Sequence, residues 1–446
     1  MPRMSASPPP VVVLGAGLTG LAAAYHLRKP CLLAERESIV GGHARSHRRQ
    51  GHTFDVTGHW LHLRDPRTRR LLAEVSPADA WVEVERRTSI FAHGARVPYP
   101  FQANLHGLPL EVVRECLVEF IAAREAAASG AQEPPRTFAE FAEARFGRGI
   151  ARHFFVPYNR KLWGAAFDRL DASWVDRYVP TPTVSQVVGG ALGLPQEGLG
   201  YNARFLYPRA GGIDALPRGL QAAIEARAPG TIRRGCAAEE VDVRGRRVKL
   251  SGQGDWQPYS ALVSTLPLPE LIARIGDAPA EVREAAAALK WIGWRYLDLA
   301  SKRPAPADYH WVYVPSPALP FFRVGVYSNA VASMAPSGAS SLYVELSERE
   351  GPVDLVAIAE GLVEVGALAE RGDIIFTDLR EIEYAYVVFD DDHGPATELL
   401  HRWLASVGIR SCGRYGAWIY NSMEDSMIQG IEAAAWATAL AERGAP

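Results

Sequence analysis

The first 35 residues contain two apolar runs separated by a glycine-rich turn, which predicts a strand, a helix and a second strand. Residues 11–14 are all apolar, GxGxxG follows from Gly15 to Gly20, and the next residues are rich in alanine. A second apolar run, residues 31–34, ends at Glu35. This order and spacing are typical of the dinucleotide-binding half of a Rossmann fold. The alternative is a Gly-rich turn arising by chance, which does not account for the flanking strands.

Each glycine of this turn has a separate physical role. Gly15 makes the tight turn, Gly17 lets the backbone approach a pyrophosphate, and Gly20 lets the helix pack closely on the strand. The helix N-terminus offers unpaired N–H groups and the positive end of its dipole to the phosphates. We expect Glu35 to accept hydrogen bonds from an adenosine ribose.

Beyond residue 60, the pattern predicts a helical middle region and a strand-rich region after residue 290. Amphipathic spacing predicts helices over residues 66–76, 111–128, 213–226, 354–371, 396–406 and 428–441, and a capping box at 137–140 opens a helical segment that continues to about residue 176. Strand-forming runs occupy residues 81–92, 240–243, 247–250 and 261–267. Five more, expected to form an antiparallel sheet, occupy residues 292–299, 310–314, 321–327, 342–346 and 384–389.

Composition narrows the class of protein. A chain of 446 residues that is 48% hydrophobic can bury the cores of two or three lobes. A net charge of −2 gives no electrostatic basis for binding nucleic acid or acidic membranes. The four cysteines lie far apart, so we expect free thiols and no metal site. With no signal-peptide pattern and no apolar run of about 18 residues, we expect a cytoplasmic protein.

A second glycine pair indicates which dinucleotide is bound. Gly41-Gly42-His43-Ala44-Arg45 begins six residues after Glu35, and the segment FDVTGH, residues 54–59, follows it. These segments resemble the flavoprotein group of amine oxidases, protoporphyrinogen oxidases and UDP-galactopyranose mutases, and the resemblance implies FAD. A Gly-rich loop in an NAD enzyme is the alternative, but the spacing from Glu35 matches the FAD pattern.

Short aromatic and arginine-containing segments resemble UDP-galactopyranose mutases, most closely the eukaryotic branch. The matches follow one another in the family's order over essentially the whole chain, at residues 97–104, 154–163, 174–177, 201–205, 207–212, 311–313, 321–323 and 413–420. A single tyrosine or tryptophan is more often part of a core, and a single arginine more often a surface charge. Seven or more matches in register are far more specific than any one of them.

The resemblance implies the fold and the division of the chain. We expect an α/β protein with a Rossmann-like FAD-binding domain, an inserted helical lobe and a mixed or antiparallel sheet on the substrate side. The expected segments are 1–95 and 201–290 for FAD binding, 96–200 for the helical lobe, 291–410 for the substrate-side sheet, and 411–446 for a C-terminal FAD-binding segment and helix.

The resemblance also implies the site residues. The cofactor-binding residues would be Gly15, Gly17, Gly20, Glu35, Gly42, Arg45, Gly58, His59, Val241, Arg414, Asp425, Ser426 and Met427. The substrate-binding residues would be Tyr99, Gln102, Phe154, Asn159, Trp163, Arg177, Asn202, Tyr313, Arg323 and Tyr420. Tyr99 would stack on the uracil. Arg177 and Arg323 would hold the diphosphate, because guanidinium groups match phosphate oxygens, and with His59 they form the implied catalytic set.

The implied activity is that of an isomerase for galactofuranose metabolism. Reduced FAD would attack the anomeric carbon and interconvert UDP-galactopyranose and UDP-galactofuranose, for a cell-surface glycan or a natural product. NADPH, NADH or a cellular flavin reductase would supply electrons, and a homo-oligomer is compatible. The alternatives are an FAD-dependent amine or protoporphyrinogen-type oxidase or desaturase, and a flavin-binding protein that has lost catalysis.

The sequence departs from the family at two places, and these departures leave more than one nucleotide sugar possible as the substrate. Thr57 stands where relatives commonly have glycine, which predicts a stiffer loop beside the flavin. After Phe389-Asp390, relatives have a diphosphate-contacting tyrosine, whereas this chain has Asp391-Asp392-His393. Clustered acids near a diphosphate would repel it unless they face away or meet sugar hydroxyls. GDP-hexose and dTDP-hexose therefore remain alternatives to a UDP-hexose.

Overall fold

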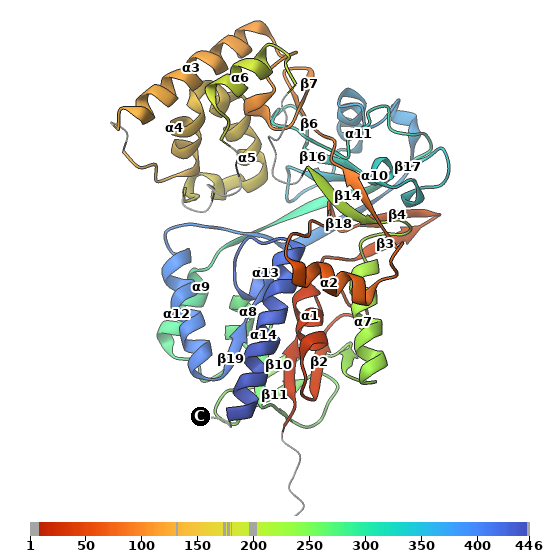
Figure 1. Cartoon of the computed structure of the whole chain (residues 1–446), viewed down its shortest axis with the longest axis vertical. Coiled ribbons are helices and arrows are strands. Elements are labelled where there is room, and N and C mark those ends of the chain that lie inside the picture. Colours follow the sequence, from red (N-terminus) through yellow and green to blue (C-terminus); the bar gives the residue numbers. More distant parts are fainter. Residues whose placement is uncertain are drawn as a thin grey trace, which may run out of the picture.

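The computed structural model describes residues 9–130, 133–172, 175, 179, 181–195 and 203–443. Figure 1 shows three regions along the long axis of the molecule. A Rossmann-like layer lies at one end, a lobe of helices at the other, and a large β-sheet between them. The α/β fold class expected from the sequence is confirmed.

The Rossmann-like layer is a parallel sheet, five-stranded among the described residues, in the order β19-β13-β1-β2-β9. Its strands are β1 (Val11–Leu14), β2 (Cys31–Glu35), β9 (Ile232–Arg234), β13 (Ala261–Ser264) and β19 (Ile409–Ser411). Every residue of β1 is buried, as a central strand with both faces covered requires. Helices α1 (Leu18–His26), α7 (Ala215–Arg227) and α14 (Met423–Arg443) cover one face. On the other face lie the β-strands β10 (Ala238–Asp242), β11 (Arg247–Leu250) and β12 (Gln257–Pro258), and the helices α8 (Leu268–Ala273), α9 (Ala280–Ala288) and α12 (His393–Ser406).

The middle sheet has the order β18-β14-β17-β16-β15-β6-β7. Its strands are β6 (Thr88–Ala92), β7 (Ala95–Pro98), β14 (Trp291–Ser301), β15 (Trp311–Tyr313), β16 (Phe321–Val326), β17 (Ser340–Leu346) and β18 (Ile374–Val387). The sheet is mixed, because β15 pairs with β6 in parallel and the other neighbours are antiparallel. It takes β6 from the predicted segment 1–95, and β7 crosses the predicted boundary at residue 95. Strand β19, which belongs to the Rossmann layer, begins at Ile409, before the predicted boundary at residue 411. The segment boundaries therefore stay a prediction.

The edge strand β18 begins ten residues before the predicted strand at 384. Every residue in its first half is exposed or half-buried, because this edge strand pairs only with β14. This half contains only a short apolar run, residues 374–376, and polar residues begin at Thr377. The predicted helix 354–371 also differs: α11 (Leu355–Glu364) ends before Gly366, whose φ of +78° cannot continue a helix.

The helical lobe packs phenylalanine-rich helices against each other. It contains α3 (Leu110–Ala128), α4 (Phe138–Ile150), a π-helical turn (Ala151–Phe155), α5 (Val156–Trp163), a 3-10 turn (Gly164–Arg169) and α6 (Val184–Ala191). The capping box predicted at Thr137 is present, with the Glu140 amide donating to its Oγ1 at 3.3 Å. A Cβ on Gly147 would lie 2.3 Å from the Glu119 carbonyl oxygen, so glycine permits the close approach of α4 to α3.

The remaining elements connect these regions. They are the hairpin β3 (Ser46–Arg49) and β4 (His52–Asp55), the pair β5 (Trp81–Glu85) and β8 (Arg204–Pro208), the 3-10 turns Phe101–Ala103, Ala332–Met334 and Arg371–Asp373, and the helices α2 (Pro66–Val75), α10 (Tyr327–Ala330) and α13 (Gly413–Gly416). Across the described ranges, no helix combines the length and the apolar character needed to cross a bilayer.

Candidate functional site

The two glycine-rich loops predicted to hold a dinucleotide lie side by side. The turn after β1 has Gly15 at φ +92°, and a Cβ on Gly20 would lie 1.9 Å from the Gly15 carbonyl oxygen. Gly17 and Gly41 form a β-bridge, and a Cβ on Gly42 would lie 3.2 Å from the Gly17 Cα. The loops therefore meet backbone to backbone at the carboxyl ends of β1 and β2, where such folds bind ligands.

Glu35 is buried at the end of β2 and is already fixed by backbone amides. Its Oε2 accepts from the Ala16 amide at 2.7 Å, and its Oε1 accepts from the Glu37 amide at 2.9 Å. Each carboxylate oxygen can accept a second hydrogen bond, so the group can also receive a ribose hydroxyl. The structure thus holds Glu35 beside the first turn, and its role toward a ribose stays a prediction.

A cluster of neutral imidazoles and arginines lies next to these loops. Burial, His59 and Arg414 lower the pKa of His43 to about 3, while burial and Arg414 lower the pKa of His59 to about 4. Both rings are therefore uncharged at neutral pH. Tyr415, in the C-terminal segment, links that segment to the second glycine-rich loop, because its hydroxyl lies 3.1 Å from His43 Nδ1.

One polar atom in this cluster points to a missing hydrogen-bond acceptor. The Arg45 Nε is buried and makes no hydrogen bond within the described structure. Leaving such a donor unpaired is costly, and a phosphate or carbonyl oxygen would satisfy it. Together with the glycine backbone, Arg45 fits a polar dinucleotide at this place.

The predicted substrate residues gather around a buried ion pair. Arg323 on β16 and Glu345 on β17 face each other across the sheet. The guanidinium donates to both carboxylate oxygens, from Nη2 at 2.7 Å and from Nε. Glu345 is 0% exposed. The pair fixes the Arg323 head group through one edge and leaves Nη1 outside the pair.

Aromatic side chains surround this pair from several elements. The Tyr313 ring lies 5.7 Å from Tyr99 and 5.2 Å from Tyr158, while the Tyr420 ring stacks on Tyr386 at 5.4 Å. Arg414 lies over both stacked rings, 4.9 Å from Tyr386 and 4.8 Å from Tyr420. The structure thus brings Tyr99, Tyr313, Arg323, Tyr420 and Arg414 into one region.

Other predicted substrate residues occupy the lobe behind this region. Phe154 is buried, stacked between Phe101 and Tyr158. Trp163 is buried against Tyr386, and Gln102 is 2% exposed. Asn159 donates from Nδ2 to the Phe155 carbonyl at 2.8 Å. Arg177 and Asn202 lie outside the described residues.

The remaining predicted cofactor residues are engaged in local structure. The Val241 amide donates to the Arg274 carbonyl at 2.8 Å, and its side chain belongs to the core. Asp425 accepts from the Ser422 amide at 2.8 Å and so caps the start of α14. Ser426 Oγ donates to Asn421 Oδ1 at 3.4 Å, and the Met427 side chain is buried.

A single lysine pairs with the acidic stretch that departs from the family and offsets part of its charge. Lys290 Nζ lies 2.6 Å from Asp390 Oδ2 and 3.1 Å from Asp392 Oδ2. His393 Nε2 lies 2.8 Å from the Trp418 carbonyl oxygen. Two of the acids are thus paired, which weakens their repulsion of an anionic substrate.

The loop that carries Gly58 and His59 is held by residues that the sequence analysis did not single out. The Tyr327 hydroxyl lies 2.8 Å from the Asp55 carbonyl oxygen and 2.9 Å from the Thr57 carbonyl oxygen. Thr57 has a φ of +59°, a conformation that a β-branched residue rarely adopts. Tyr327 therefore holds this turn in a strained conformation directly before Gly58.

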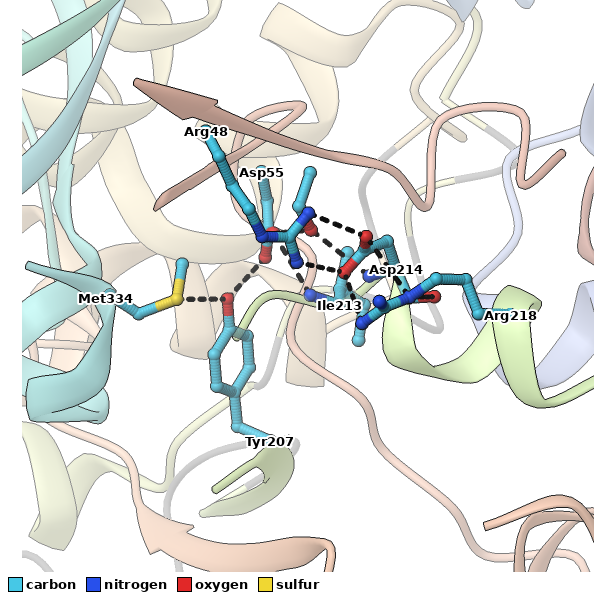
Figure 2. Close-up of polar contacts among 8 residues, drawn as sticks. Arg48, Asp55, Tyr207, Ile213, Asp214, Arg218 and Met334 are labelled. Carbon is cyan, nitrogen blue, oxygen red and sulfur yellow. Dashed lines mark hydrogen bonds and ion pairs between the residues drawn. The ribbon is translucent and has the colours of Figure 1, made fainter. Parts of the chain in front are cut away.

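Asp55, which precedes the same loop, lies at the centre of a polar network (Figure 2). Its Oδ2 accepts from the Tyr207 hydroxyl at 2.5 Å, and its Oδ1 accepts from Ser46 Oγ at 2.7 Å and from the Ile213 amide at 3.1 Å. A bidentate ion pair between Arg48 and Asp214 lies beside it, at 2.9 and 3.0 Å. Asp55 thus joins the hairpin β3–β4, strand β8 and the start of α7.

Replacing Asp55 by asparagine should flatten part of the pH dependence of stability. Burial raises the pKa of Asp55 to about 7, against about 4 in an unfolded chain. The folded protein therefore holds this proton through a range where the unfolded chain has released it. Stability should fall as pH rises from about 4 to about 7, by at most about 1.4 kcal/mol per pH unit from this group.

Urea unfolding at several pH values between 4.5 and 7.5 measures this effect. In Asp55→Asn, the part of the fall in stability with rising pH that this group causes should disappear. Asp308→Asn, a change at an exposed acid, should retain it. Parallel pH profiles for Asp55→Asn and the unchanged protein would show that the Asp55 pKa is not raised.

Comparisons with known proteins agree with the fold and the glycine-loop geometry. Residues 13–75 match the NAD(P)-binding Rossmann-like domain family. The crystal structure of a reduced UDP-galactopyranose mutase superposes with a TM-score of 0.86 and 28% identity, covering 96% of this chain and 94% of the mutase. A putative protoporphyrinogen oxidase from Exiguobacterium sp. gives a TM-score of 0.70 at 16% identity, covering 96% and 98%. Cyclohexylamine oxidase from Brevibacterium oxydans gives 0.68 at 16%, covering 98% and 99%.

The fold and the paired glycine loops define a Rossmann-fold flavoprotein, a class that includes enzymes of several kinds. The two oxidases share the fold alone with this chain at such low identity. The predicted resemblance to the UDP-galactopyranose mutase family is confirmed over essentially the whole chain.

Proposed function

We propose that this protein is a flavin-dependent isomerase that interconverts the pyranose and furanose forms of a nucleotide sugar, with UDP-galactose as the first candidate. The observation that carries the proposal is the Arg323–Glu345 pair among tyrosine side chains. A fixed guanidinium beside hydroxyl donors suits a diphosphate, whereas an amine or polyene oxidase needs an apolar cavity at this place.

The proposed cofactor is FAD, bound by the paired glycine loops, Glu35, Arg45 and the segment from Gly58 to His59. When bound and reduced, FAD supplies the nucleophile for the anomeric carbon of the sugar. His59 is neutral, so we assign it to shaping the loop beside the cofactor and not to proton donation at neutral pH. NADPH, NADH or a flavin reductase would supply the electrons.

The chain's own residues orient the substrate and stabilise the departing diphosphate. Arg323, held through Nε and Nη2, presents Nη1 to a phosphate oxygen. The nearby Tyr386 and burial raise the pKa of Tyr420, so its hydroxyl stays protonated and can donate. Tyr313 on β15 is close enough to Tyr420 to act on it electrostatically. We assign Arg177 to a second phosphate contact by its position in the family motif.

Turnover of the reduced enzyme tests this function directly. The protein is reduced with dithionite under nitrogen, mixed with UDP-galactofuranose, and the products are separated by ion-exchange chromatography. We expect UDP-galactopyranose with the reduced enzyme and none with the oxidised enzyme. GDP- and dTDP-linked hexoses, run in parallel, test the base and the sugar.

An oxidase gives a different result in the same preparation. It would consume oxygen with an amine or porphyrinogen substrate and leave all nucleotide sugars unchanged. Spectroscopically confirmed reduction without isomerisation of any of the three nucleotide sugars would overturn the proposed function.

A further inference from the structure

Lys161 on α5 is surrounded by backbone carbonyl oxygens. Its Nζ lies 3.0 Å from the oxygen of Val314, 2.6 Å from Ser316, 3.0 Å from Leu319 and 2.6 Å from Phe321. An ammonium group has three N–H donors, so the four oxygens share them. The side chain occupies the turn between β15 and β16 as a bound cation would.

The conformation of this turn therefore depends on the positive charge of Lys161. Burial lowers the pKa of Lys161 to about 7, whereas the four carbonyl dipoles favour its charged form. Without the ammonium, the four oxygens would converge on one another with no donor between them. A lysine on a solvated helix face does not produce such a dependence.

The turn held by Lys161 leads directly into the proposed substrate region. Tyr313 precedes the first carbonyl at Val314, and Arg323 follows the last one at Phe321 by two residues. Helix α5 also carries Tyr158, whose ring meets Tyr313 at 5.2 Å and Phe322 at 6.3 Å. Four hydrogen bonds from Lys161 and two ring contacts from Tyr158 thus join the helical lobe to β15, β16 and the turn between them.

A second cation joins the same helix to another part of the sheet. Arg349 donates to the Leu162 carbonyl at the end of α5 and, at 2.5 Å, to the Gly293 carbonyl of β14. It therefore ties the lobe to the sheet without touching the turn between β15 and β16. The chain thus supplies a matched control for the role of Lys161.

We propose that Lys161 is a positioning residue that fixes the β15–β16 turn against helix α5 and thereby sets the places of Tyr313 and Arg323 in the nucleotide-sugar site. The nucleotide sugar in this inference comes from the proposed function, whereas the positioning role of Lys161 comes from its contacts with the four carbonyl oxygens. The residue acts through the backbone of the turn and does not touch substrate.

Lys161→Met tests the mechanism without any substrate. Methionine keeps most of the side-chain volume and removes the charge and its donors. Hydrogen–deuterium exchange should become faster at residues 314–323 in this variant, and it should stay unchanged there in Arg349→Met. Lys161→Arg, which keeps a cation with several donors, should restore part of the protection.

Binding of UDP to the holoenzyme tests the consequence. The dissociation constant should rise about tenfold in Lys161→Met, as expected when phosphate-binding groups lose their positions, with flavin content per folded molecule unchanged. Arg349→Met should bind UDP within about twofold of the unchanged protein. A merely structural role would lower the melting temperature in both variants and leave the affinity alike in both.

The two proposals fail in distinguishable ways. Unchanged exchange at residues 314–323 in Lys161→Met, or equal acceleration in Arg349→Met, overturns the role of Lys161 whatever the substrate is. An unchanged protein that binds neither UDP nor the GDP and dTDP analogues contradicts the proposed function, and the exchange result still decides the role of Lys161. If Lys161→Met does not fold, Lys161→Gln, which keeps a hydrogen-bond donor and removes the charge, takes its place: exchange at residues 314–323 and UDP affinity identical to those of the unchanged protein overturn the proposal.

Discussion

Replacing Arg323 by alanine should abolish isomerisation and also destabilise the fold. The variant would leave Glu345, which is 0% exposed, as a buried carboxylate without its partner. Removing one member of a buried ion pair costs about 3–5 kcal/mol. Loss of a phosphate ligand should lower turnover by at least about a hundredfold. Urea unfolding and the isomerisation assay measure the two effects separately.

A double variant separates stability from activity. Arg323→Met combined with Glu345→Leu removes both charges, and replacing a buried pair by apolar residues is often neutral or stabilising. The double variant should recover most of the stability and none of the activity. Near-normal turnover in it would remove Arg323 from the mechanism, and no recovery of stability would mean that the pair is not the cause of the loss.

The variant Glu345→Gln tests whether the Glu345 carboxylate holds the Arg323 guanidinium in place. Glutamine has one acceptor oxygen where the carboxylate has two, so Arg323 should keep only one of its two hydrogen bonds and lose its counter-charge. We expect a larger effect on turnover than on the melting temperature. The reverse result would assign Glu345 to stability alone.

The parts of the fold that could be predicted from the sequence are those in which local pattern and burial agree. Strands β1 and β2 are apolar runs because both of their faces are covered. Gly15 marks the turn after β1, and Gly20 marks the close packing of helix α1 on that turn. The first half of β18 was not found in this way, because its apolar run is only three residues long, 374–376, and is followed by mostly polar residues on an exposed edge strand.

The supporting residues of the site escaped prediction for a different physical reason. Lys161 is held by four backbone carbonyls. Every residue has a backbone carbonyl, so no residue type in the sequence marks these partners. Glu345 acquires its role from Arg323 across two strands, a partnership set by register. A charged residue in the otherwise apolar run of β17 was the available signal. The roles given to Val241, Asp425 and Met427 came from resemblance, and they stay predictions.

Two glycines of the first turn should respond differently to the same substitution. In Gly20→Ala the added Cβ would lie 1.9 Å from the Gly15 carbonyl oxygen. That carbonyl cannot move freely, since the Gly15 amide donates to the Ala34 carbonyl at 2.8 Å and its φ is +92°. The helix must shift away from β1, so we expect loss of both stability, by about 1–3 kcal/mol or more, and FAD.

Gly17→Ala has room in the protein without cofactor. Its Cβ would lie 3.9 Å from the Gly42 Cα, an ordinary contact, so the apoprotein should unfold at the temperature of the unchanged protein. The methyl group would stand where a pyrophosphate needs the bare backbone, and FAD affinity should fall by at least about a hundredfold. Gly276→Ala, which meets nothing within 4 Å, controls for the substitution itself. Calorimetry of apoprotein and fluorescence titration with FAD measure both effects. If Gly17→Ala retained FAD, the cofactor would not lie on this turn, and the assignment of every residue around it would fall.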